Sequence, residues 1–124
     1  MNYSVIPTPK FKRELKRLYK KYPSLRSDLL ELERNLSENP HQGTNLGGNT
    51  FKIRIAIKSK GKGKSGGARI ITFIVNDDHE LYLLTIFDKS EIENIDDKTL
   101  TKLIKEIKHI VYREKPFRKF PGSH

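Results

Sequence analysis

Large apolar side chains occupy every second position from residue 51 to residue 57, and this pattern is the strongest constraint on the fold. A period of two residues places one set of side chains on each face of an extended chain, so the segment predicts a β-strand with one buried and one solvated face. The solvated positions are mostly cationic: Lys52, Arg54, Ala56 and Lys58. Two further runs of β-branched and apolar residues follow at 68–75 and 81–87, joined by a polar turn at 76–78. Together the three runs predict an antiparallel meander.

Helical periodicity flanks these strands on both sides. Residues 9–22 and 25–38 each repeat apolar side chains at helical spacing, and Thr8-Pro9 is a typical helix start. These two segments predict a helical hairpin. A third amphipathic helix is expected from Asp97 and should end before Pro116.

The remaining segments complete one domain. Residues 2–6 predict a short edge strand, and residues 41–50, which are glycine-rich and without periodicity, predict a loop. A chain of 124 residues suffices for one hydrophobic core, so we assign the domain to residues 1–115 and a basic tail, partly an expression-tag remnant, to residues 116–124. The expected fold class is α+β, a small single domain in which an antiparallel sheet carries an N-terminal helical hairpin and a C-terminal helix.

Composition excludes several classes of function. The chain has no cysteine, which removes disulfides, thiolate metal sites and a cysteine nucleophile. No run approaches the roughly 20 apolar residues of a membrane span, and the N-terminus lacks the apolar core of a signal peptide. We therefore expect a cytoplasmic protein with no membrane partner. The crowded acids at residues 77–80 are interpreted as solvated turn residues, so we expect no metal site and no cofactor.

Positive charge is both large and concentrated. Lys and Arg number 25 against 15 Asp and Glu, which gives a net charge of +10. No acid occurs between Asn39 and Asn76, whereas that segment holds the cations Lys52, Arg54, Lys58, Lys60, Lys62, Lys64 and Arg69. Such an excess attracts polyanions. Nucleic acid is the first partner to consider, and an anionic membrane or a merely solvated basic surface are the alternatives.

The densest part of this segment is the glycine–lysine run at residues 58–69. Glycine lets the backbone come close to a ligand, and alternate lysines supply point charges for phosphates. A flexible, solvated hairpin loop is the alternative interpretation. A Walker A phosphate loop is excluded, because Lys58 stands in the place of that motif's first glycine and no helix follows.

Two stretches of sequence carry a specific resemblance. The first is Lys-Gly-Lys-Gly-Lys-Ser-Gly-Gly-Ala-Arg-Ile-Ile at residues 60–71, and the second is Leu-Tyr-Leu-Leu-Thr-Ile-Phe-Asp-Lys-Ser-Glu at residues 81–91. Their combination resembles the RelE/ParE toxin superfamily and, within it, the HigB-like branch. The predicted hairpin, loop and strand follow the superfamily's order, so the resemblance covers residues 2–111. It implies a RelE-like fold.

The resemblance implies a toxin of a type II toxin–antitoxin system. Such a toxin is a metal-independent endoribonuclease that cleaves messenger RNA on the ribosome and inhibits translation. Its partners are the ribosome, the messenger and a cognate antitoxin, with which it forms a hetero-oligomer. In the reaction the ribose 2′-hydroxyl attacks the adjacent phosphorus, so the site must accept a proton, donate a proton and stabilise charge on the phosphate oxygens. A gyrase-poisoning ParE-like toxin and a catalytically inactive RNA-binding module are the alternatives.

Three cations are candidates for catalysis. Arg69 matches the family's Gly-Gly-x-Arg position and is the candidate phosphate clamp, since a guanidinium presents a planar fork to two oxygens. Lys89, just after the last predicted strand, is the candidate acid or electrostatic stabiliser. Lys58 is a candidate proton carrier. The alternative for each is an ordinary surface cation, with Arg69 paired to an acidic neighbour.

Further side chains are candidates for RNA binding. They are cations of the predicted strand and loop together with one tyrosine: Lys52, Arg54, Lys60, Lys62, Lys64 and Tyr82. Lys52 is a second candidate proton carrier, and Tyr82 is either a stacking platform for a base or a packed sheet tyrosine. Many ribosome-dependent members of the family carry a tyrosine or histidine after the last strand, and residues 90–97 contain neither. The general base is therefore unassigned, and His41 and His79 are interpreted as surface histidines.

Overall fold

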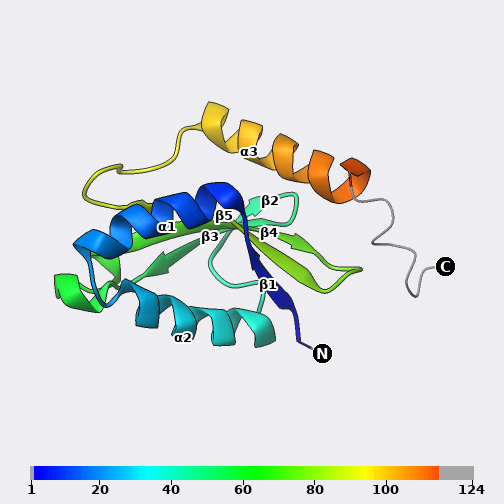
Figure 1. The fold of residues 1–124 in the computed structure, drawn as a ribbon. Helices are drawn as coiled ribbons and strands as arrows, with labels where there is room; N and C mark the ends of the chain where they lie inside the picture. The colour runs from blue at the N-terminus through cyan, green and yellow to red at the C-terminus, as the bar shows by residue number, and fades with distance from the viewer. Residues whose placement is uncertain (1, 115–124) are drawn as a thin grey trace. The chain divides into compact units, whose positions relative to one another are not determined.

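The computed structural model describes residues 2–114, which form two compact units divided after Asn94. The first unit is a five-stranded sheet with strand order β1-β5-β4-β3-β2 and two helices (Figure 1). Its elements are β1 (Ser4–Pro7), α1 (Pro9–Lys21), α2 (Leu25–Glu38), β2 (Thr44–Gly47), β3 (Thr50–Ile55), β4 (Ala68–Val75) and β5 (Glu80–Asp88). The second unit holds α3 (Asp97–His109) and a π-helical turn (Ile110–Glu114). Within residues 2–114, three α-helices and a mostly antiparallel sheet confirm the α+β class.

The central sheet follows the prediction, with additions at both edges. β3, β4 and β5 pair antiparallel as the expected meander. β1 pairs with β5 in parallel, from Ser4 opposite Glu80 to Pro7 opposite Leu83. The predicted edge strand is therefore confirmed. Parallel strands need a long crossover connection, and α1 and α2 form the first part of the chain that connects β1 to β5.

The prediction of a loop over residues 41–50 is wrong, because β2 lies within it and pairs with β3. The two strands are joined at Gly48 and Asn49, which have positive φ values of 57° and 63°. Positive φ at both central residues is the geometry of a tight type I′ hairpin turn, which glycine and asparagine favour. The Gly-Asn pair was the signal for this hairpin, although the short strand before it has no hydrophobic alternation.

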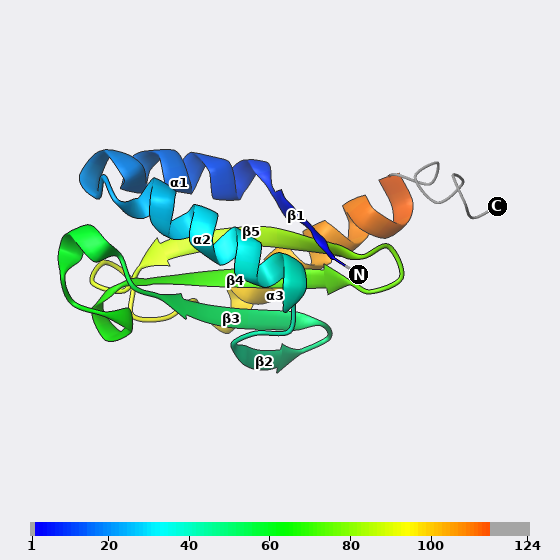
Figure 2. The ribbon, with the colours of Figure 1, turned by 90° about the horizontal axis from the view of Figure 1, so that it is seen from below.

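The helical hairpin covers one face of the sheet (Figure 2). Thr8 caps α1 as predicted: its Oγ1 accepts from the backbone N of Phe11 at 3.3 Å and donates to the carbonyl of Leu83 at 2.9 Å. Buried apolar side chains from both helices meet those of β3, β4 and β5 in one core: Phe11, Leu18, Leu25, Leu36, Ile53, Ile55, Ile70, Ile74, Leu81, Leu83 and Ile86. The apolar positions of β3 therefore face the helices, and its cations Lys52 and Arg54 face away.

The glycine–lysine segment is more ordered than a flexible loop. β3 ends at Ile55, and the chain then forms two 3₁₀ turns at Lys58–Lys60 and Lys64–Gly66. The backbone N of Lys58 donates to Asp28 Oδ2 at 3.1 Å, and that of Ser59 donates to Ser24 Oγ at 2.8 Å. Both acceptors lie at the start of α2, so the first turn is attached to the helical hairpin. Gly61 and Gly63 supply positive φ values of 70° and 64° between the two turns.

The second unit begins as predicted. Asp96 caps α3 by accepting from the backbone N of Thr99 at 2.7 Å, and this bond lowers the pKa of the Asp96 carboxyl. The helix passes into its π-helical turn after His109. Residues 115–124, with the predicted basic tail, lie outside the described residues, so the domain boundaries stay a prediction. No helix among residues 2–114 has the length and apolar character that crossing a membrane requires.

We expect Gly67→Ala to distort the entry into β4. The added methyl group would collide with the backbone carbonyl oxygen of Ile55 and lie 3.0 Å from the Cα of Ala56, so relief requires a backbone shift. Overpacking of this kind costs about 1–3 kcal/mol, which urea denaturation would show as a lower free energy of unfolding. Ser65→Ala is the control, because it changes an exposed residue of the same loop and adds no atom, so it should alter the free energy of unfolding little. Equal losses in the two variants would contradict the steric explanation.

Candidate functional site

Two arginines lie side by side on the sheet face that points away from the helical hairpin. Arg54 of β3 and Arg69 of β4 are directly opposite each other in the antiparallel register, and opposed side chains share a face. Lys52 lies two residues before Arg54 on the same face, and its Nζ donates to Asn94 Oδ1 at 3.3 Å. Three of the predicted cations are thus brought together on two neighbouring strands.

Arg69 does not fit the alternative interpretation of a surface arginine paired with an acidic neighbour. It is 6% exposed, and its Nη1 donates to the carbonyl oxygens of Lys64 at 2.9 Å and Ala68 at 3.1 Å. Among residues 2–114 no carboxylate forms an ion pair with it. Burial and, to a smaller extent, the charge of Arg54 lower its pKa. A fixed guanidinium beside a second guanidinium, with no carboxylate to neutralise it, favours the binding of an anion.

Lys89 lies at the end of β5 next to this pair. Its backbone N donates to the carbonyl of Gly67 at 3.0 Å, which extends the β4–β5 ladder beyond its last paired residues. Phe87 is opposite Arg69 in that ladder. Because side chains two residues apart share a face, the backbone directs Lys89 to the face that carries Arg69. The lysine is half-buried.

Lys58 does not join the arginine pair in this structure, and its catalytic role stays a prediction. Its side chain is 71% exposed, and its Nζ lies 3.5 Å from Glu31 Oε2 on α2. The reason is that β3 ends at Ile55, before the alternation of the sequence ends. The 3₁₀ turn then carries Lys58 to the helical side of the sheet.

Lys60 forms an ion pair within the fold, and its role in RNA binding stays a prediction. Its Nζ lies 2.8 Å from Asp88 Oδ1, in an ion pair whose side chains are 8% and 0% exposed. Asp88 also accepts from the hydroxyl of Tyr22 at 2.6 Å and from Oγ and backbone N of Ser90 at 2.7 and 3.0 Å. Burial alone would raise the pKa of Asp88, but the hydrogen bonds from Lys60, Tyr22 and Ser90 outweigh it and hold that pKa far below its usual range.

The other predicted RNA-binding residues are divided. Lys62 and Lys64 are exposed in the loop, and the Lys64 carbonyl holds Arg69. Tyr82 is 4% exposed, lies opposite Phe73 and donates its hydroxyl to Glu80 Oε1 at 2.8 Å. Its partner Phe73 is four residues from Arg69 on β4, a separation of roughly 13 Å along the strand. Stacking on a base would require this side chain to become exposed.

The histidines considered from the sequence lie away from the arginine pair. His79 is in the turn between β4 and β5, with its ring centroid 5.1 Å from that of Tyr3. His41 packs edge-on against Phe51, with 5.7 Å between centroids. Neither supplies a base to the cationic face. Among residues 2–114 no cluster of carboxylates and histidines is suited to hold a metal ion.

Sequence reasoning missed two polar contacts that support this region. Glu14 of α1 accepts through Oε1 from Thr85 Oγ1 at 2.7 Å and from the backbone N of Ile86 at 3.1 Å. Glu91 accepts from Arg17 at 2.8 Å and lies 3.2 Å from Lys21 Nζ, and these bonds lower the pKa of Glu91. The partners in each contact are at least 70 residues apart in sequence, so no spacing pattern could reveal them.

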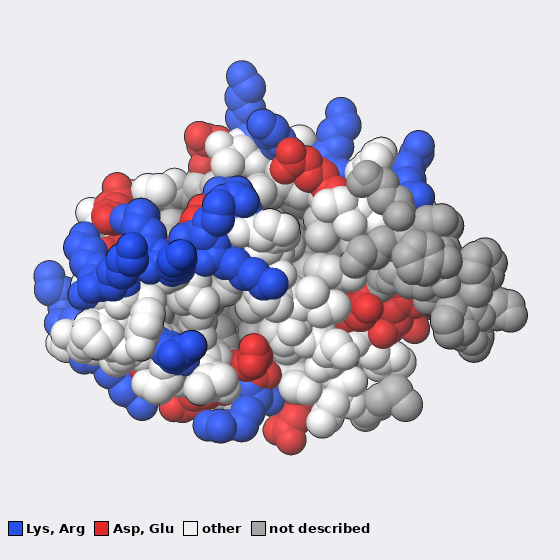
Figure 3. Space-filling model, in the orientation of Figure 1, with Lys and Arg blue, Asp and Glu red and all other residues white. Residues whose placement is uncertain are grey.

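A second concentration of positive charge covers α1 (Figure 3). The helix sequence PKFKRELKRLYKK holds seven Lys and Arg against one Glu. Two of these cations, Arg17 and Lys21, bind Glu91. The surface of α1 therefore stays strongly basic beyond its ion pairs.

Comparisons with known proteins agree with this architecture. A family model described as RelE toxin of RelE / RelB toxin-antitoxin system matches residues 8–117. The free E. coli toxin RelE, as a mutant, is 13% identical with a TM-score of 0.59, covering 86% of this chain and 99% of that one. The isolated E. coli RelE toxin is 13% identical with a TM-score of 0.53, and the match covers 85% of this chain and 98% of that one. A chain of the RelBE2 toxin–antitoxin complex from Mycobacterium tuberculosis is 20% identical with a TM-score of 0.52, and the match covers 71% of this chain and 99% of that one. At these identities the solved structures show the shared fold.

We expect Asp88→Asn to lower the free energy of unfolding by about 3 kcal/mol at pH 7, because it leaves the Lys60 charge buried without its partner. Folding lowers the pKa of Asp88, so its ionised form stabilises the protein above the unfolded-state pKa of about 4. That contribution is lost as the pH falls below this value. Urea denaturation should therefore show the wild-type advantage narrowing from about pH 5 to pH 2.

Glu91→Gln is the control for this experiment, because it removes a more exposed carboxylate from its ion pairs with Arg17 and Lys21. It should cost less than about 1 kcal/mol. A loss for Asp88→Asn that is as small as the control's and independent of pH would show that the buried pair has no special role.

Proposed function

The chain belongs to the RelE toxin family of toxin–antitoxin systems, and we propose that it is an endoribonuclease that cleaves messenger RNA on the ribosome without a metal ion and thereby inhibits translation. The observation that carries this proposal is the juxtaposition of Arg54 and Arg69 with no carboxylate paired to Arg69 among residues 2–114. Its finer placement in the HigB-like branch rests on the motifs at residues 60–71 and 81–91.

The proposed chemistry needs only charge and protons. The ribose 2′-oxygen forms a bond to the adjacent phosphorus while the bond from phosphorus to the 5′-oxygen breaks, which leaves a cyclic phosphate and a free 5′-hydroxyl. Arg69 and Arg54 would stabilise the charge that develops on the phosphate oxygens. Lys89 would donate a proton to the departing 5′-oxygen. Lys52 is the candidate acceptor for the proton of the 2′-hydroxyl, since Lys58 lies on the helical side.

The ribosome has a defined task in this proposal. The cationic face offers several groups that stabilise a phosphate, whereas His41 and His79 lie away from the arginine pair and Tyr82 is buried. Holding the messenger with its 2′-hydroxyl in line with the breaking bond would supply the orientation that these side chains lack. Exposed Lys62 and Lys64 would add contacts to RNA backbone. A ribosomal substrate also places the protein in the cytoplasm.

Cognate antitoxin is the second proposed partner. The Mycobacterium tuberculosis structure is a toxin–antitoxin complex, and membership of the same family leads us to propose a comparable hetero-oligomer here. The cationic face requires an inhibitor of opposite charge, so the inhibiting part of the antitoxin should be acidic.

Purified protein should cut messenger on programmed ribosomes and leave 2′,3′-cyclic or 3′-phosphate and 5′-hydroxyl ends, whereas the same RNA without ribosomes should survive far longer. Arg54→Ala should lower kcat by at least about tenfold, and Arg69→Ala by about 10²–10³, in protein whose fold is checked by circular dichroism. Arg34→Ala, an exposed arginine of α2, is the control and should cleave normally. Products with 5′-phosphates would refute the mechanism, and intact messenger with double-strand breaks in gyrase-treated DNA would identify a gyrase poison instead.

RNA binding should weaken steeply with salt, because each cation that contacts a phosphate releases counterions. For single-stranded RNA, Arg54→Ala should reduce the slope of log K against log salt by about 0.7. Fluorescence anisotropy over about 50–200 mM salt measures this slope. Arg34→Ala should leave the slope unchanged, and an unchanged slope for Arg54→Ala would remove that arginine from the interface.

A further inference from the structure

Lys60 differs from the other lysines of the glycine–lysine segment, because its side chain is 8% exposed and theirs are exposed. Its Nζ lies 2.8 Å from Asp88 Oδ1, donates to Ser90 Oγ at 3.2 Å and is 5.2 Å from the centre of the Tyr22 ring. Removing an ammonium group from water is costly unless such partners compensate for the lost hydration. The burial of Lys60 therefore favours a role within the protein.

Asp88 connects this lysine to the end of β5. Its Oδ1 binds Lys60 and also accepts from the backbone N and Oγ of Ser90 at 3.0 and 2.7 Å. Lys89 lies between Asp88 and Ser90 in the chain, so the carboxylate holds the backbone on both sides of Lys89. One carboxylate group therefore ties the first 3₁₀ turn of the segment to the residues that carry Lys89.

The other end of the segment leads to Arg69. The Lys64 carbonyl accepts from Arg69 Nη1 at 2.9 Å and from the backbone N of Gly67 at 3.3 Å. The Gly67 carbonyl in turn accepts from the backbone N of Lys89 at 3.0 Å. The backbone of the segment therefore contacts both Arg69 and Lys89, the two cations to which the proposed reaction assigns different steps.

The sequence of this segment makes an external attachment necessary. Gly61 and Gly63 lie between its two 3₁₀ turns with positive φ values of 70° and 64°, and glycine without restraint populates many other conformations. Lys60 immediately precedes Gly61, so its ion pair fixes the chain at the point where this freedom begins. Fixing the chain there reduces the number of conformations in which the Lys64 carbonyl lies away from Arg69.

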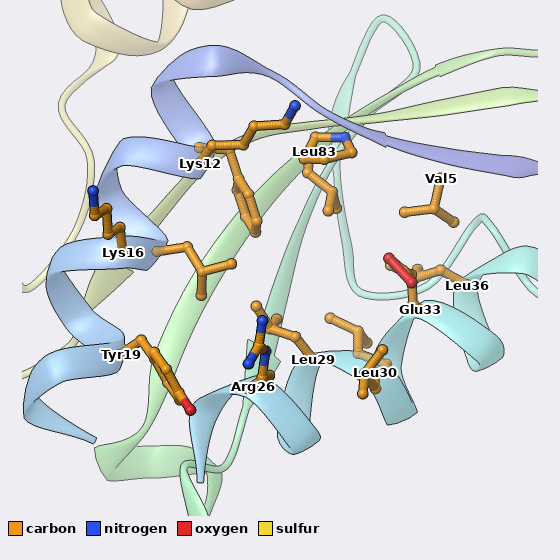
Figure 4. Close-up of a pocket in the computed structure, with 14 residues that line it drawn as sticks. Val5, Lys12, Lys16, Tyr19, Arg26, Leu29, Leu30, Glu33, Leu36 and Leu83 are labelled. Atoms are coloured by element: carbon orange, nitrogen blue, oxygen red, sulfur yellow. The ribbon is translucent and has the colours of Figure 1, made fainter. Parts of the chain in front are cut away.

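The ion pair is separate from the apolar pocket of the helical hairpin (Figure 4). That pocket lies between α1 and α2 and has a volume of about 370 Å³. Tyr22, Lys60 and Asp88 are not among the residues that line it. Substitutions in the ion pair therefore leave the lining of the pocket unchanged, and their effect on the cations of the sheet can be measured separately.

We propose that Lys60 and Asp88 are positioning residues, whose ion pair holds the Arg69 guanidinium and Lys89 in a fixed relative position without contacting RNA. The effect on catalysis rests on the proposed function, whereas the effect on the order of the segment does not. Groups that act on one phosphate must be held accurately, and a misplacement of about 1 Å can lower a rate by about 10²-fold. Loss of the pair should therefore lower kcat more than it lowers the affinity for RNA.

Cleavage on programmed ribosomes and RNA binding separate positioning from contact. Lys60→Met should lower kcat by at least about tenfold and leave the slope of log K against log salt unchanged. Lys62→Met, at an exposed lysine of the same segment, should lower that slope by about 0.7 and raise KM more than it changes kcat. Lys60→Arg keeps the charge opposite Asp88 and should recover most of kcat. Equal losses of slope in the two methionine variants would overturn the proposal and make Lys60 an RNA contact.

A double variant separates positioning from a general loss of stability. Lys60→Met leaves the Asp88 carboxylate buried without its cation, which destabilises the fold. Lys60→Met/Asp88→Asn removes both charges and keeps an acceptor for Tyr22 or Ser90, so urea denaturation should show it more stable than either single variant. Its kcat should nevertheless stay low, because the segment is still not attached to β5. Recovery of kcat together with stability would show that the pair has only a structural role.

Hydrogen exchange tests the positioning without RNA. In the double variant the backbone amides of Gly67 and Lys89, which donate to the Lys64 and Gly67 carbonyls, should exchange at least about tenfold faster than in the wild type. The amide of Phe73, within β4, is the control and should keep its rate. Unchanged exchange at Gly67 and Lys89 would overturn the proposal whether or not the protein cleaves RNA. Faster exchange in a protein whose wild type leaves messenger intact would support the positioning and refute the proposed function alone.

Discussion

A β-bulge in β5 decides which side chains meet on each face of the sheet. Ile71 is opposite Thr85, but the next residue of β4, Thr72, is opposite Leu83, so the ladder passes over one residue of β5. Before this irregularity the odd-numbered residues of β5 face the helices, and after it the even-numbered ones do. Glu14 binds the strand just beyond the bulge, through the backbone N of Ile86.

The change in side-chain alternation at the bulge has two consequences for the candidate site. It turns Asp88 toward the helices, where the carboxylate meets Tyr22 and Lys60, and it turns Lys89 toward the face of Arg69. The ion pair then fixes the first part of a loop that would otherwise be costly to order, because glycine has the largest conformational freedom to lose. The second part of the loop is fixed by Arg69 itself, through the carbonyl of Lys64.

These contacts explain what could be predicted from the sequence and what could not. The hairpin, the meander and the cationic face follow from periodicity and capping, which are local properties of the chain, and the predictions from them were correct. The roles of Lys58 and Lys60 depend on where β3 stops and on which face Asp88 occupies. Regular alternation along β5 from Leu81 and Leu83 would have placed Asp88 on the face away from the helices. The bulge turns Asp88 toward the helices instead. A charged residue at the end of an otherwise apolar strand was the available hint that a partner was needed.

The cations of this chain fall into two groups, those paired with a carboxylate within the fold and those that are not. Lys60 has Asp88, Lys58 has Glu31, and Arg17 and Lys21 share Glu91, so these charges are used within the fold. Arg69 has carbonyl partners that fix its position without neutralising its charge. Two guanidiniums held in adjacent strands repel each other, and this repulsion is a cost that the folded state carries when the face is empty. An anion that binds between them removes the repulsion. The arrangement that lowers the stability of the ligand-free protein therefore increases its affinity for a phosphate.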